Sequence, residues 1–96
     1  MIRVRFIIPK TDNEGVASPL DSIDHALADK FGGFTRSDVV GAWRNDGVVQ
    51  TEGSFAYDVA VEAEDLCSLL TYIEYFKSWA KQKKLYVEIS GGAGLV

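Results

Sequence analysis

The chain has 96 residues, of which 47% are hydrophobic, 25% charged and 11% aromatic, as in globular domains and unlike disordered or collagen-like chains. This length suits a single domain, residues 1–96, with one core. The net charge of −4 is the wrong sign for a phosphate-backbone binder, and one cysteine excludes both an internal disulfide and a multi-cysteine metal site. We therefore expect no nucleic-acid partner, no metal and no cofactor.

Apolar runs such as Phe6-Ile7-Ile8 are far too short to cross a membrane. An apolar signal segment does not follow Met1. The sequence therefore predicts a cytoplasmic protein without a membrane partner.

The first third of the chain predicts a strand followed by a helix. Apolar and polar residues alternate over residues 1–9, as in a half-buried strand. A helix is expected over residues 19–31, with Ser18 as its cap and Pro19 in its first position. The pair Gly32-Gly33 follows as the left-handed stop.

The middle of the chain predicts a long hairpin. Residues 34–44 are rich in β-formers, and Asn45-Asp46-Gly47 is a strong hairpin-turn signal. Residues 48–62 then continue as a strand, in which Gly53 suggests a bulge.

The last third predicts a longer helix and a final strand. An apolar stripe at helical spacing covers residues 62–84, and three lysines crowd its end, where positive charge suits the helix dipole. Residues 85–90 alternate again, and the glycine-rich residues 91–96 are expected to form a flexible or hairpin-like tail.

The resulting order, β-α-β-β-α-β, is that of the α+β ferredoxin-like fold. We predict a four-stranded antiparallel sheet with both helices on one face and the first and third strands at its centre. The other face of the sheet is then uncovered. This open face is expected to hold a charged cluster formed by Arg3, Arg5, Asp58, Glu62 and Glu88.

The charged cluster has two interpretations. It could position a carboxylate or phosphate through the arginines, or it could consist of cross-strand ion pairs that keep the face solvated. We favour ion pairing, because the neighbouring carboxylates compete with any anion for the arginines.

Two further surfaces are candidates for function. Tyr72, Tyr75 and Trp79 widen the apolar stripe of the second helix beyond what one sheet face covers, which suggests self-association or docking of a protein partner. Trp43, Arg44 and Glu52 flank the hairpin and could shape a cleft there.

Several short motifs resemble a group of small uncharacterised bacterial proteins. They are Phe31-Gly32-Gly33-Phe34-Thr35, Gly41-Ala42-Trp43, Asp46-Gly47, Glu52, the strand at residues 57–61 and the strand at residues 86–91. The resemblance covers most of the chain and implies a stand-alone ferredoxin-like domain of bacteria or their mobile elements. It implies no activity and assigns no functional residue.

The leading functional hypothesis is a small non-catalytic binding or interaction module, forming a homodimer or docking another protein through its second helix or its open face. The alternatives are a small-ligand sensor, or a dimeric ferredoxin-like enzyme with a cleft near Trp43 and Glu52. A further alternative is an acidic inhibitor protein from a mobile element, which would require more clustered carboxylates than the sequence offers.

Overall fold

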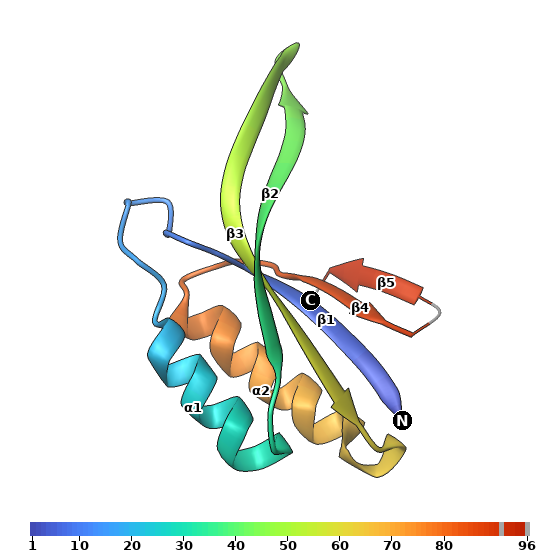
Figure 1. The fold of residues 1–96 in the computed structure, drawn as a ribbon. Coiled ribbons are helices and arrows are strands. Elements are labelled where there is room, and N and C mark those ends of the chain that lie inside the picture. The colour runs from blue at the N-terminus through green and yellow to red at the C-terminus, as the bar shows by residue number, and fades with distance from the viewer. Residues whose placement is uncertain (91, 96) are drawn as a thin grey trace.

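A computed structural model of the chain describes residues 1–90 and 92–95. Figure 1 shows one sheet with two helices packed beside each other on the same face of it. In chain order the elements are β1 (Ile2–Pro9), α1 (Leu20–Phe31), β2 (Thr35–Asn45), β3 (Val48–Val61), the 3-10 turn η1 (Ala63–Asp65), α2 (Leu66–Trp79), β4 (Tyr86–Ile89) and β5 (Gly92–Leu95).

The sheet has the order β2-β3-β1-β4-β5, and every neighbouring pair of strands is antiparallel. Its first four strands, with β1 and β3 at the centre and both helices on one face, confirm the predicted α+β ferredoxin-like fold. The glycine-rich end adds a fifth strand, because Gly92–Leu95 pairs with β4.

The core lies between the sheet and the helices. Phe6 of β1 stacks on Tyr57 of β3, with ring centroids 5.0 Å apart, and Phe76 of α2 packs against Phe6 at 5.8 Å. These rings belong to a cluster of buried side chains from all layers: Val4, Phe6, Ile8, Ile23, Leu27, Tyr57, Val59, Val61, Leu69, Ile73, Phe76, Ala80, Leu85 and Val87. The alternation of β1 and β3 therefore directs one side of each strand at the helices.

The start of α1 differs from the sequence prediction. Ser18 does not cap the helix; its hydroxyl donates a hydrogen bond of 2.6 Å to the carbonyl of Pro9, at the end of β1. The end of α1 is as predicted, since Gly32 adopts a left-handed φ of 82° and its N–H bonds to the carbonyl of Ala28.

The second helix is shorter than predicted. The predicted range of residues 62–84 divides into the turn η1 and the helix Leu66–Trp79. Lys81 takes a positive φ of 54°, which a right-handed helix cannot contain. The three lysines expected in the last helical turns therefore follow the helix.

The β2–β3 hairpin projects beyond the helix–sheet layers (Figure 1). Its turn is formed by Asp46 and Gly47, which have φ values of 51° and 79°, as a tight primed turn requires. The ladder runs without interruption from Thr35–Asp58 to Asn45–Val48. Gly53 pairs within it, so the bulge expected at Gly53 is wrong.

Candidate functional site

An arginine–aspartate cluster lies at the centre of the open face. Asp58 of β3 is opposite Arg5 of β1, and its two carboxylate oxygens accept hydrogen bonds from Nε and Nη2 of Arg5, each 3.0 Å long. The hydrogen bond to Asp58, together with its charge, raises the pKa of Arg5 above its usual value. Arg5 is therefore held in a bidentate pair, the strongest geometry for these two groups.

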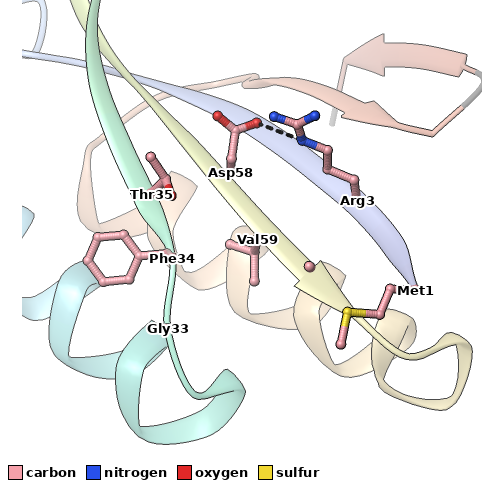
Figure 2. A pocket seen from close by; sticks show the side chains of 8 residues that line it. Met1, Arg3, Gly33, Phe34, Thr35, Asp58 and Val59 are labelled. Carbon is pink, nitrogen blue, oxygen red and sulfur yellow. Dashed lines mark ion pairs between the residues drawn. The ribbon is translucent and has the colours of Figure 1, made fainter.

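Arg3 is held much less firmly. It pairs with Ala60, so it lies diagonally across from Asp58 on the same face. Its Nε is 3.7 Å from Oδ1 of Asp58, and 72% of its side chain is exposed. Figure 2 shows its guanidinium reaching over the sheet toward Asp58. The carboxylate that Arg3 approaches is already occupied by Arg5.

The two glutamates predicted in this cluster take a smaller part. Glu88 lies opposite Arg5 across the β1–β4 pair, but its carboxylate accepts a hydrogen bond of 3.2 Å from the hydroxyl of Tyr86. Burial, and then this hydrogen bond, raise the pKa of Tyr86. Glu62 is exposed and follows the end of β3. Within residues 1–90 and 92–95, the ion pairs of Arg3 and Arg5 are with Asp58 alone.

Two hollows adjoin this cluster and share Arg3 and Asp58. The larger, of about 380 Å³, extends from Asp58, Val59 and Ala60 toward Gly33, Phe34 and Thr35 (Figure 2). The smaller, of about 260 Å³, continues toward Arg5, Glu88 and Ser90. The charged cluster therefore forms the boundary between two adjoining depressions of one surface.

The hairpin separates the three residues of the predicted cleft. Glu52 pairs with Gly41 and Trp43 pairs with Gln50, so Trp43 and Glu52 lie on the same face of the ladder. Arg44 pairs with Val49 on the opposite face, and its Nη1 donates to the carbonyl of Gly47 in the turn. A cleft that includes all three side chains is therefore wrong, because consecutive strand residues point to opposite faces.

Trp43 and Glu52 share their face with the charged cluster. The ladder continues from Gly41–Glu52 to Thr35–Asp58, and residues on alternate pairs face the same side. Trp43 is 48% exposed. The open face of the sheet thus extends into the hairpin, where it carries an indole and a carboxylate.

The aromatic residues of α2 lie away from the open face. Tyr72 packs edge-on against Phe31 of α1, with centroids 5.7 Å apart, and also against Tyr75. Trp79 packs against Phe76 at 5.4 Å. Tyr75 and Trp79 are still 51% and 43% exposed. The contact with α1 therefore covers Tyr72 in part and leaves the other two half-exposed.

Sequence reasoning missed Gly33 and Thr35, which line the larger hollow. The position of the motif Phe31-Gly32-Gly33-Phe34-Thr35 beside β3 depends on where the β2–β3 ladder begins, and a local pattern does not determine this. Among the described residues, groups of three or more metal-ligating side chains are not found, nor is a helix long and apolar enough to cross a membrane.

The sequence matches no protein-family model and no curated protein. Solved structures do match it in fold. One is a phage SAM lyase in complex with S-methyl-5'-thioadenosine, with a TM-score of 0.65 at 15% identity, covering 99% of this chain and 88% of the lyase. Another is a phage SAM lyase in the apo state, with a TM-score of 0.64 at 16% identity. This match covers 99% of this chain and 87% of that lyase. At this identity the likeness shows a common fold.

Proposed function

We propose that this chain binds S-adenosylmethionine and cleaves it to S-methyl-5'-thioadenosine, as a SAM lyase does. The observation that carries the proposal is the extent of the fold match, which covers 99% of this chain and so takes in the projecting hairpin as well as the two-layer core. Ferredoxin-like folds support many unrelated functions. The residues of the open face must therefore supply the chemical argument.

The proposed reaction defines what the site must do. S-methyl-5'-thioadenosine is S-adenosylmethionine without its amino-acid chain, so the bond from the sulfonium sulfur to that chain is the one that breaks. The bonding electrons remain on sulfur, which becomes a neutral thioether. The carboxylate of the same amino-acid chain forms a bond to the carbon that sulfur leaves, so this chain departs as a lactone and the step needs no other reactant. The site must hold the nucleoside and orient the amino-acid chain, and fixing such a geometry is itself a large source of rate acceleration.

Trp43 and Glu52 have the chemistry to hold a nucleoside. The half-exposed indole of Trp43 is a surface on which adenine can stack. Glu52 lies on the same face, and its carboxylate can accept hydrogen bonds from the two hydroxyls of a ribose. Gly41, which pairs with Glu52, adds no side chain to the surface between them. This assignment keeps two residues of the predicted cleft and leaves out Arg44.

The hairpin face is open when the chain is alone, so we propose that a second copy closes it. Val48 lies on the face of Trp43 and Glu52 and is 57% exposed. Val40 and Val49, on the opposite face of the same arm, are 73% and 58% exposed, so the whole arm is available to a second copy. A two-stranded hairpin of this kind is marginally stable by itself. A homo-oligomer in the cytoplasm, the location expected from the sequence, is therefore part of the proposal.

The test is to incubate the purified protein with S-adenosylmethionine and to separate the products by liquid chromatography. The wild type is expected to release S-methyl-5'-thioadenosine. Glu52→Gln should lower kcat/KM by about tenfold or more, the value of a hydrogen bond to a charged group. Trp43→Ala should weaken binding of S-methyl-5'-thioadenosine by about fivefold or more, from the lower end of the range for base stacking.

Two matched variants control for these changes. Glu62→Gln removes an exposed carboxylate beyond the end of β3, and Arg44→Ala alters the opposite face of the hairpin. Both should retain the wild-type rate. The proposal is wrong if the wild type neither releases S-methyl-5'-thioadenosine nor binds it in calorimetry.

A non-catalytic module that self-associates through α2, the leading hypothesis from the sequence, is the second candidate. The half-exposed Tyr75 and Trp79 favour it. It predicts an oligomer without turnover of S-adenosylmethionine, so the same assay separates the two functions.

A further inference from the structure

The larger hollow exists because β3 extends beyond its partner β2. The β2–β3 ladder begins at Thr35 and Asp58, whereas β3 continues to Val61 and remains paired with β1. Gly33 lies on the other side of the gap, and Figure 2 shows the chain there running away from the end of β3. One corner of the sheet therefore lacks the strand that would cover the outer edge of β3.

This corner offers backbone hydrogen-bonding groups. Consecutive residues of a strand direct their N–H and C=O groups to alternate sides, so either Val59 or Ala60 directs its pair toward the uncovered edge. The described backbone hydrogen bonds outside regular elements do not join this part of β3 to Gly33 or Phe34. A donor and an acceptor are thus available to a ligand in the hollow.

The side chains around the corner combine both signs of charge. The guanidinium of Arg3 is largely exposed, at 3.7 Å from a carboxylate that already accepts two bonds from Arg5. Asp58 and Glu88 add negative charge beside it, and both line the adjoining hollow. The charges of the two arginines and the two carboxylates cancel, so Arg3, Arg5, Asp58 and Glu88 together have no net charge. A simple anion would be attracted by Arg3 and repelled by the two carboxylates.

We propose that this corner binds the zwitterionic head of an α-amino acid. Its carboxylate accepts hydrogen bonds from Arg3 and from the free backbone N–H of β3, and its ammonium group donates a hydrogen bond to Asp58, which lines the same hollow. A dipolar ligand replaces the loose contact between Arg3 and Asp58 without leaving either charge unpaired. It therefore avoids the competition that disfavours a simple anion.

Two sources of this chemical group are possible: a free amino acid, or the amino-acid end of S-adenosylmethionine. The second source alone rests on the proposed function. Glu52 and Asp58 are about 20 Å apart along β3 at roughly 3.3 Å per residue, so the corner and the hairpin face are separate regions of one copy. The end of S-adenosylmethionine would reach the corner from the hairpin of another copy, whereas a free amino acid needs one copy only.

The experiment follows backbone amide resonances of the full chain by NMR during titration with L-methionine, acetate, S-adenosylmethionine and S-methyl-5'-thioadenosine. L-methionine should shift the resonances of Arg3 and Ala60, and acetate at the same concentration should not. Arg3→Met, which retains the apolar stem of the side chain, should weaken the binding of L-methionine by about tenfold or more. The matched variant Arg44→Met should bind it as the wild type does.

The outcomes separate this inference from the proposed function. Arg3-dependent binding of L-methionine supports the corner site even if neither nucleoside binds. If Arg3→Met weakens the binding of S-adenosylmethionine but not that of S-methyl-5'-thioadenosine, the amino-acid end of S-adenosylmethionine occupies the corner. The inference is overturned if acetate shifts the resonances of Arg3 and Ala60 as much as L-methionine does. It is also overturned if neither L-methionine nor S-adenosylmethionine shifts these resonances in a way that depends on the side chain of Arg3.

Discussion

The hydroxyl of Tyr57 donates a hydrogen bond of 2.7 Å to Oδ1 of Asp24, which joins the central strand β3 to helix α1. The ring of Tyr57 is fully buried, and Arg36 of β2 donates to the other oxygen of the same carboxylate. The polar end of a core residue is thereby satisfied at the edge of the core. Asp24 holds a helix and two strands together through one side chain.

Tyr57→Phe should lower the free energy of unfolding by about 1 kcal/mol, the usual net value of one hydrogen bond. Asp24 keeps its pair with Arg36, so its half-buried carboxylate is not left without a partner. Urea denaturation measures the change. Tyr75→Phe alters a half-exposed tyrosine and should leave stability unchanged. Equal effects of the two substitutions would contradict this role of Tyr57.

The same residue predicts a loss of stability at alkaline pH. Burial, and then the hydrogen bond to Asp24, raise the pKa of Tyr57 in the folded chain. The resulting stabilisation is complete below about pH 10, where tyrosine is neutral in the unfolded chain, and is lost as the pH rises further. The slope of stability against pH in this range should be smaller in Tyr57→Phe. An identical slope in the variant would show that other groups cause the loss.

Arg5→Ala should cost about 1 kcal/mol or less, because Arg5 is 40% exposed and its pair with Asp58 is partly solvated. The difference from wild type should shrink at high salt, which screens exposed charges. Arg3→Ala, which removes a longer and more exposed contact, should cost less than Arg5→Ala. A loss of about 3 kcal/mol or more would instead identify Asp58 as a buried charge left without its partner.

Trp79→Lys should disrupt self-association through α2 and leave the fold intact. The buried side chains of this helix are Leu69, Ile73 and Phe76, so the core does not depend on Trp79. Light scattering measures the mass in solution, and circular dichroism checks the fold. Val16→Lys adds the same charge to the exposed loop before α1, outside both α2 and the hairpin, and serves as a control. A monomeric wild type would refute association through α2.

Gly47→Ala should destabilise the hairpin by about 1 to 2 kcal/mol, because Gly47 has a φ of 79° that a side chain makes costly. A Cβ at this position would contact nothing within 4 Å, so the cost is conformational rather than steric. Gly41→Ala is the matched control, since its new Cβ would lie at an ordinary 3.9 Å from the carbonyl oxygen of Glu52. Similar amide exchange of the hairpin in both variants would contradict the assigned turn.

The sequence by itself determined the order of elements and most of their faces. The alternation of β1 and β3, the apolar stripes of the helices and the Asp46-Gly47 turn are local patterns, and each acts within a few residues. Alternation alone also places Trp43 and Arg44 on opposite faces. The predicted cleft that combines them conflicts with this alternation, which is a local property of the strand.

Only the tertiary structure decided the features that depend on distant partners. Ser18 bonds to Pro9 instead of capping α1, because the end of β1 lies beside it in the fold. The corner hollow depends on the offset between the ends of the β2–β3 and β1–β3 ladders. The preference of Asp58 for Arg5 over Arg3 depends on register, because the directly opposite residue reaches both oxygens and the diagonal one does not. Register is fixed by packing between segments far apart in the chain, so local periodicity cannot supply it.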